Sequence, residues 1–236
     1  DAAYGILVAG IGGTGVLTVS ALLGMAAHVE GRACTTLDFT GMAQKNGAVT
    51  SHIRIAARGD DLHAVRVGAG AASLVLGCDM VVAASPPTLS AMRPGHTRVI
   101  VNDTLTPTAR FVQDRDMDMQ AGPMQRALQD AAGAGHVEFL PAAALATALL
   151  GDAIATNLFM LGYAVQAGRV PLSLAAIERA IELNGTAVES SKAAFAWGRW
   201  AAHDRAVVAR AAGVTPPPEP ESLAALIARH VATLTD

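Results

Sequence analysis

The chain contains 236 residues, of which 52% are hydrophobic, 16% charged and 4% aromatic, and its formal net charge is −3. A chain of this length forms one large domain, or one domain with a helical appendage, and it needs no metal or disulfide to be stable. The low charged fraction excludes disorder. The pI near 6.2 argues against nucleic-acid binding as the main task, because nucleic-acid-binding domains usually carry a strongly basic patch.

Two cysteines, Cys34 and Cys78, stand far apart and form no Cys-x-x-Cys pair. Two thiols cannot make a zinc ribbon or hold an iron–sulfur cluster alone, because each of these sites takes four ligands. We interpret both as reduced, buried thiols of a cytosolic protein. No basic stretch precedes an apolar core at the start of the sequence, so we expect no signal peptide.

The first third of the chain predicts a β-α-β unit followed by two further strands. Tyr4–Ala9 is a short apolar run typical of a buried strand, Val16–Val29 is rich in alanine and leucine like a helix, and Ala33–Phe39 predicts a second strand. Val49–Ala56 and Leu62–Val67 both alternate between two faces, so we expect them to pair as an antiparallel hairpin.

The middle of the chain predicts three more strands, over Met80–Ala84, Arg98–Val101 and Val137–Leu140. The stretch Thr104–Gly122 is polar and irregular, and we expect a surface excursion there.

From Ala142 onward the pattern is helical, with breaks at Gly151, at 168–171 and at 184–185. A long helix is predicted over Ala187–Ala212. Three prolines at 216–218 then form a stiff spacer before a last helix over Ser222–Leu234.

One apolar stretch, Phe139–Gly168, contains a single charged residue, Asp152. It also contains a proline and several glycines, and Gly151-Asp152 is typical of a helix end followed by a new N-cap. We therefore expect two short buried helices here and no membrane span.

Together these elements predict an α/β protein: a three-layer α/β/α Rossmann-like sheet, mostly parallel with an antiparallel hairpin, followed by a helical C-terminal part. We expect residues 1–140 to form the α/β domain, residues 141–212 to pack on it as helices, and residues 213–236 to form a proline-rich spacer and a terminal helix.

Residues 10–15 (GIGGTG) form a Gly-x-Gly-x-x-Gly motif between the first strand and the first helix. Glycines there permit a tight turn, and the helix N-terminus offers free N–H groups and a partial positive charge to a phosphate. The alternative is that the glycines only let the helix pack closely on the strand. The candidate binding residues of this loop are Gly10, Gly12, Gly13, Thr14 and Gly15.

Different ligand classes would suit such a loop. A dinucleotide needs an acidic residue about 20 residues onward, and Asp38 comes late, 28 residues after Gly10. The opening strand, glycine loop and acidic second strand also resemble the ATP-dependent ubiquitin-activating-like enzymes, but the segment 78–86 (CDMVVAASP) lacks the following acidic residue that adenylation requires.

A second glycine-containing segment, residues 40–49 (TGMAQKNGAV), follows the second strand. Its glycines, lysine and amides can donate N–H groups and an ammonium to an anion. A plain surface loop is the alternative. The candidate binding residues are Gln44, Lys45, Asn46 and Gly47.

Three motifs in this order, GIGGTGV, GMAQKNG and SHIRI, resemble the gamma subunit or gamma domain of the 2-oxoacid:ferredoxin oxidoreductases. Later segments at 105–112, 151–162 and 180–189 resemble the indolepyruvate:ferredoxin oxidoreductase branch, and the resemblance covers most of Tyr4 to His203.

The resemblance implies an enzyme that oxidatively decarboxylates aryl 2-oxo acids on thiamine diphosphate with Mg²⁺, passes electrons through iron–sulfur clusters to ferredoxin, and transfers the acyl group to coenzyme A. It places thiamine diphosphate and the clusters in alpha/beta and iron–sulfur partner domains, and it associates this module with coenzyme A. The expected roles are a phosphate cradle at residues 12–15, and pyrophosphate or pantetheine contacts at Gln44, Lys45 and Asn46.

Other side chains are interpreted as structural. His52 and Arg54 share one strand face and form a structural pair, and we find no carboxylate pair or nucleophile typical of a catalytic centre. Phe195, Trp197 and Trp200 pack the terminal helices together or contact a partner domain. Two other functions stay open: an independent enzyme that binds NAD or ATP, and an assembly domain whose glycine loop binds nothing.

Overall fold

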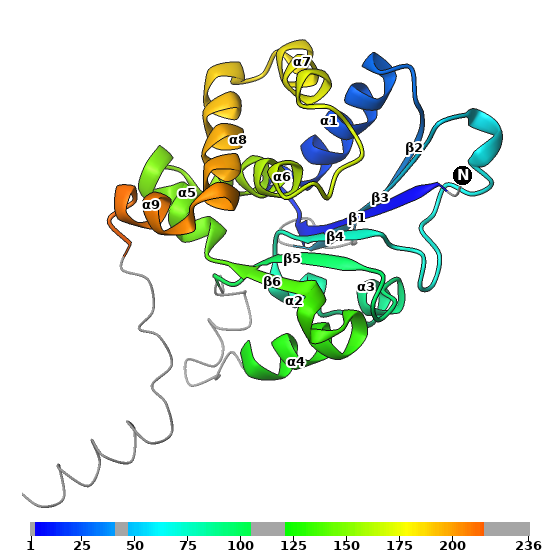
Figure 1. The fold of residues 1–236 in the computed structure, drawn as a ribbon, viewed down its shortest axis with the longest axis horizontal. Coiled ribbons are helices and arrows are strands. Elements are labelled where there is room, and N and C mark those ends of the chain that lie inside the picture. Colours follow the sequence, from blue (N-terminus) through cyan, green and yellow to red (C-terminus); the bar gives the residue numbers. More distant parts are fainter. Residues whose placement is uncertain (1–2, 41–46, 105–120, 215–236) are drawn as a thin grey trace, which may run out of the picture.

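The computed structural model describes residues 3–40, 47–104 and 121–214. Its strands form one mixed sheet in the order β2-β3-β1-β4-β5-β6 (Figure 1). β1 is parallel to β4, β4 to β5 and β5 to β6, while β3 is antiparallel to both of its neighbours. The strands are β1 (Tyr4–Ile11), β2 (Ala33–Thr40), β3 (Ala48–Ala56), β4 (Leu74–Gly77), β5 (Arg98–Asn102) and β6 (Val137–Leu140).

Helices cover both faces of the sheet, which makes three layers (Figure 1). On one face lie α1 (Val16–Val29), α5 (Ala142–Leu150), α6 (Thr156–Gln166), α7 (Leu174–Asn184), α8 (Val188–His203) and α9 (Arg205–Ala211). On the other face lie α2 (Met80–Ala83), α3 (Pro86–Ser90) and α4 (Ala121–Ala132). The expected three-layer, mostly parallel α/β architecture is confirmed.

Strand alternation creates the two hydrophobic cores. Ile6 and Val8 of β1 point to the large core, which also contains Ile53 and Phe159. Leu7, between them, points to the smaller core under α2, α3 and α4. The smaller core lies mainly under β4, β5 and β6, so the β2-β3-β1 end of that face is less covered (Figure 1).

The expected hairpin between Val49–Ala56 and Leu62–Val67 is wrong. β3 already has a hydrogen-bonded neighbour on each side, because β2 and β1 both pair with it. The antiparallel hairpin of this fold is therefore β2-β3. Residues 62–67 instead cross one face of the sheet, where the Val67 N–H donates to Nδ1 of His52 over 3.2 Å.

The strand expected at Met80–Ala84 is also wrong. The buried strand is β4, six residues earlier, and residues 80–83 form the short helix α2. Asp79 sets this boundary because its Oδ1 accepts a hydrogen bond of 2.9 Å from the Val82 N–H, which caps the helix. Gly77, the last residue of β4, lets α2 approach the strand closely, since a Cβ there would lie 2.8 Å from the Ala83 Cβ.

The other elements lie close to their expected positions, and the stretch Phe139–Gly168 holds the two short helices α5 and α6. The long helix expected over Ala187–Ala212 is interrupted at Asp204, whose Oδ1 accepts from the Val207 N–H (2.9 Å) and caps α9. No helix in the described residues is long and apolar enough to cross a bilayer. The expected surface excursion, over its residues 105–120, and the spacer and helix at 216–234 lie outside the described residues.

Candidate functional site

The glycine loop connects the C-terminal end of β1 to the first turn of α1. Gly13 and Gly15 have positive φ angles of 85° and 94°, a region that residues with a Cβ rarely adopt. Gly15 is the N-cap of α1, so the helix has no side-chain cap. The conformation explains two of the glycines directly, and it leaves the helix N-terminus open to a ligand.

Gly10 has a different role from the rest of the loop. It is buried in β1, where a Cβ would lie 2.7 Å from Val16 Cγ2 and 3.1 Å from the Cys78 Cβ. This glycine therefore lets α1 and the β4–α2 turn approach the strand. Close packing was the alternative role inferred from the sequence for all the loop glycines. For Gly10, that alternative is correct.

The N–H groups at the start of α1 are available to an anion. In the described part of the chain, no protein acceptor takes the backbone N–H of Gly13, Gly15, Val16 or Leu17. Gly13 and Thr14 are exposed, and the first turn of α1 contains no acidic side chain. A helix end of this kind carries partial positive charge and binds phosphate or carboxylate groups.

The second glycine-containing segment lies beside the first. The Gly12 N–H donates to the Gly47 carbonyl oxygen over 2.8 Å, and a Cβ on Gly12 would lie 3.4 Å from that oxygen. Gly47 immediately precedes β3, and Thr40 ends β2, so both ends of this segment are fixed at the same end of these two paired strands. Gln44, Lys45 and Asn46 lie outside the described residues.

Asn157 holds the loop from the other side, and sequence reasoning did not assign it a role. It belongs to α6, is 2% exposed, and its Nδ2 donates to the Thr14 carbonyl oxygen over 2.8 Å. The Thr14 hydroxyl donates to the Ile11 carbonyl oxygen over 2.7 Å, which turns the side chain back onto the loop. An amide inside an otherwise apolar run was the available signal for Asn157.

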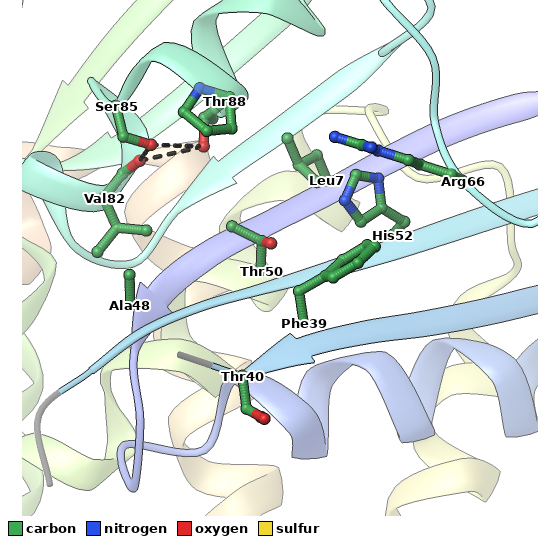
Figure 2. Close-up of a pocket in the computed structure, with 11 residues that line it drawn as sticks. Leu7, Phe39, Thr40, Ala48, Thr50, His52, Arg66, Val82, Ser85 and Thr88 are labelled. Carbon is green, nitrogen blue, oxygen red and sulfur yellow. Dashed lines mark hydrogen bonds between the residues drawn. The ribbon is translucent and has the colours of Figure 1, made fainter. Parts of the chain in front are cut away.

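A pocket of about 340 Å³ lies beside the ends of the second segment, on the opposite face of the sheet from α1 (Figure 2). Leu7 and Thr50 form its floor, and Phe39, His52 and Arg66 lie together at one side. Ser85 and Thr88 lie at the other side, where both hydroxyls donate to the Val82 carbonyl oxygen. The described residues that line it are Leu7, Phe39, Thr40, Ala48, Thr50, His52, Arg66, Val82, Ser85, Pro87 and Thr88.

His52 is the buried titratable group of this pocket. Burial, then the nearby Arg66 guanidinium, lower the pKa of the imidazole, and Asp38 acts weakly in the opposite direction. Nδ1 accepts from the Val67 N–H, so the neutral ring carries its proton on Nε2. Phe39 packs edge-on against His52 with ring centroids 5.2 Å apart, and Arg66 lies 5.5 Å from the centre of the Phe39 ring.

The predicted pairing of His52 with Arg54 is not a direct contact. The Arg54 Nη1 donates to the Ala64 carbonyl oxygen over 3.0 Å, whereas His52 contacts Val67 and Phe39. Within the described ranges, no group of three or more histidine, cysteine or acidic residues has the geometry of a metal site.

The fold and the site define an α/β module with a glycine loop at the end of its first strand that presents backbone N–H groups at the start of α1. The family model for pyruvate ferredoxin/flavodoxin oxidoreductase matches residues 5–201. The chain therefore belongs to this family and is a component of a 2-oxoacid:ferredoxin oxidoreductase, which confirms the resemblance drawn from its motifs.

Two relatives of the chain are both named indolepyruvate oxidoreductase subunit IorB. The indolepyruvate oxidoreductase subunit IorB of Pyrococcus horikoshii is 28% identical over 203 residues, covering 85% of this chain and 96% of that protein. The IorB subunit of Methanothermobacter thermautotrophicus is 28% identical over 170 residues, covering 72% of this chain and 81% of that protein.

Solved structures share the fold. The pyruvate oxidoreductase subunit PORC of Thermotoga maritima is 20% identical with a TM-score of 0.59, covering 85% of this chain and 97% of that one. The gamma subunit of a keto/oxoacid ferredoxin oxidoreductase from Geobacter sulfurreducens is 19% identical with a TM-score of 0.59, covering 85% and 98%. A 2-oxoglutarate:ferredoxin oxidoreductase from Magnetococcus marinus, solved with 2-oxoglutarate, coenzyme A and succinyl-CoA, is 14% identical with a TM-score of 0.62, covering 86% and 31%.

Proposed function

We propose that this chain is the coenzyme A-binding gamma module of an indolepyruvate:ferredoxin oxidoreductase. The observation that carries the proposal is the hydrogen bond between Gly12 and Gly47, because it holds two glycine-containing segments together at the open start of α1. The names of the IorB relatives support the indolepyruvate branch. The Magnetococcus marinus enzyme, similar in fold, was solved with coenzyme A.

The residues of the loop fit the phosphates of coenzyme A. Among the described residues, no protein acceptor takes the N–H groups of Gly13, Gly15 and Val16, and the first turn of α1 has no acidic side chain; backbone donors of this kind suit phosphate oxygens. Lys45, with Gln44 and Asn46, supplies further donors from the second segment. In this arrangement the loop binds a phosphate, and the second segment binds the pyrophosphate or the pantetheine amides.

The pocket next to the second segment suits an uncharged part of the same ligand. Phe39 and the buried His52 ring offer an aromatic wall, and the His52 Nε2–H is a donor for an amide or ring acceptor. Thr40 and Ala48, at the two ends of the second segment, belong to its lining. Coenzyme A supplies the thiol that receives the acyl group; the residues of this chain bind and orient it.

Thiamine diphosphate, its Mg²⁺ and the iron–sulfur clusters belong to the partner domains in this proposal. The chain has two cysteines, and a cluster takes four ligands. Burial raises the pKa of Cys34 to about 11 and that of Cys78 to about 12, so neither thiol readily becomes a thiolate ligand. Both thiols are free; Cys78 is buried as expected, whereas Cys34 is half-buried, and unbridged thiols of this kind also support a location in the cytoplasm.

Contacts with the thiamine diphosphate domains are supported by exposed apolar side chains at the start of α1, just before α6 and on α8. Leu17, in the first turn of α1, is 44% exposed, and Ile154, just before α6, is 60% exposed. Trp200 on α8 is 57% exposed. Large apolar side chains on a surface are typical of interfaces within a permanent assembly.

Charge reversal at the second segment tests the proposal. Lys45→Glu should abolish measurable coenzyme A binding by the 236-residue chain in calorimetric titration, because it replaces a phosphate donor with a repelling charge. The melting temperature should stay within a few degrees.

The matched control is Lys192→Glu, because Lys192 is the one other lysine and lies on the surface of α8 in an ion pair with Glu182. This variant carries the same change in net charge and should bind coenzyme A like the wild type. Unchanged affinity in Lys45→Glu, or an equal loss in both variants, would overturn the role of Lys45.

A further inference from the structure

A second pocket lies at the opposite end of the sheet from the glycine loop. Its lining includes Tyr4 and Arg98, the first residues of β1 and β5, and Ser73, which immediately precedes β4. The end of the sheet at which β1 begins is well separated from the end that leads into α1 (Figure 1). The pocket has a volume of about 660 Å³ and is distinct from the coenzyme A site proposed above.

The lining of this pocket is strongly basic. Among the described residues that line it are four arginines and one histidine and no acidic residue, although the whole chain has a net charge of −3. The basic residues come from separate segments: Arg54 from β3, Arg98 from β5, Arg93 and His96 from the turn between α3 and β5, and Arg169 from the turn after α6.

None of these arginines is neutralised within the described part of the chain. The ion pairs found there join Arg58 to Asp60, and Arg179 and Lys192 to Glu182. Four uncompensated guanidinium groups that share one pocket repel one another, and an anion between them relieves that repulsion.

The guanidinium groups also retain unused hydrogen-bond donors. Arg54 and Arg98 each use one Nη1 on a backbone carbonyl oxygen, of Ala64 (3.0 Å) and Gly135 (3.2 Å), which fixes the side chains and leaves their other N–H groups. The Nε of Arg169 is buried and has no partner among the described residues. The Tyr4 hydroxyl donates to the Arg169 carbonyl oxygen over 2.8 Å, which anchors this turn.

We propose that this arginine pocket binds a small phosphorylated anion with at least two negative groups. Guanidinium forms paired, charge-assisted hydrogen bonds to phosphate oxygens, and arginines from several segments match a ligand with several such oxygens. The volume exceeds what a single phosphate fills and suits a diphosphate or a small organic phosphate.

Inorganic pyrophosphate is the probe for the test. Calorimetric titration of the 236-residue chain should show pyrophosphate binding that the double variant Arg93→Gln/Arg169→Gln weakens by about tenfold or more, the effect of removing charge-assisted hydrogen bonds. Arg93 is exposed and the Arg169 Nε has no hydrogen-bond partner among the described residues, so the double variant should keep its fold. If the double variant does not fold, the single variant Arg93→Gln should lower the affinity for pyrophosphate by about threefold or more.

Two controls locate the effect. Arg126→Gln/Arg210→Gln removes the same two charges from exposed positions on α4 and α9 and should leave the affinity within about twofold. Titration in the presence of saturating coenzyme A should leave intact the binding that Arg93→Gln/Arg169→Gln weakens, because coenzyme A then occupies the glycine loop and the second segment; this control rests on the proposed function and separates the two sites. The proposal fails if the wild type binds no pyrophosphate at millimolar concentration, if both double variants lose binding equally, or if saturating coenzyme A abolishes the binding.

Discussion

Single residues explain how the glycine loop is held in its conformation. Gly13 and Gly15 adopt φ angles that side chains disfavour, Gly12 is bonded to Gly47, and Asn157 fixes the Thr14 carbonyl oxygen. The loop is therefore held from α6 and from the β3 end at once. A loop preorganised in this way loses little conformational freedom when an anion binds.

The candidate site was predictable only in part at this scale. The Gly-x-Gly-x-x-Gly spacing between a strand and a helix indicates the loop, because the spacing itself carries the turn geometry. Asn157 and Arg66 come from segments far from the loops in the sequence, so their contributions depend on the tertiary fold. The motif spacing also predicts a ligand contact for Gly10, whereas the atoms around Gly10 show that it serves the packing of α1 and the β4–α2 turn.

His52 makes the stability of the fold depend on pH. Burial and Arg66 lower its pKa in the folded chain below the ordinary value near 6.5, so the unfolded chain binds more protons as the pH falls below that value. The free energy of unfolding that depends on a neutral His52 is fully present above the pKa of His52 in the unfolded chain. It is lost as the pH falls through that value. The free energy of unfolding should therefore decrease from about pH 7.5 to about pH 5.5.

Urea unfolding of His52→Asn checks this dependence. The asparagine Oδ1 can accept from the Val67 N–H in place of Nδ1, so the variant keeps the hydrogen bond and loses the titration. Its free energy of unfolding should change less with pH than that of the wild type, while the exposed His63→Asn should follow the wild type. Identical pH profiles for the wild type and His52→Asn would contradict the account.

At the scale of elements, two glycines determine how closely α6 and α8 pack. A Cβ on Gly162 would lie 2.0 Å from the Phe195 carbonyl oxygen, and a Cβ on Gly198 would lie 1.8 Å from the Phe159 carbonyl oxygen. The backbones of the two helices are thus in direct contact. Phe159 and Phe195, each at most 1% exposed, fill the core beside this crossing.

Gly198→Ala should force the two helices apart. Because the clashing atom is a backbone oxygen, the helix itself must move, and we expect the free energy of unfolding in urea to fall by about 3 kcal/mol. Gly59→Ala is the control, since a Cβ there meets nothing within 4 Å, and it should change stability by less than about 0.5 kcal/mol. A Gly198→Ala variant as stable as the wild type would show that the helices are not in this close contact.

Elements were predictable where local pattern and tertiary context agree. β1, α1 and β6 combine clear hydrophobic periodicity with glycine or capping signals, and the structure places them within a residue or two of expectation. The strand expected at Met80–Ala84 is a helix because Asp79 caps it, and the short apolar run does not distinguish the two. The segment 62–67 alternates like a strand, but both edges of β3 are already paired.

At the scale of the whole molecule, two regions rich in hydrogen-bond donors lie at opposite ends of the strands. The glycine loop with the second segment lies at the end of β1, and the arginine pocket lies where β1 begins. The exposed Leu17 and Ile154 lie near the loop and not in the lining of the arginine pocket. A partner domain that covers these side chains would therefore border the proposed coenzyme A site rather than the arginine pocket.

The most direct test of the central claim is calorimetric titration of the 236-residue chain with coenzyme A, with NAD and ATP titrated in parallel. The account predicts saturable binding of coenzyme A and none of NAD or ATP, because Asp38 stands late for a ribose contact and the segment 78–86 lacks the acidic residue of adenylating enzymes. Binding of NAD or ATP in preference to coenzyme A, or of no ligand at millimolar concentration, would contradict it.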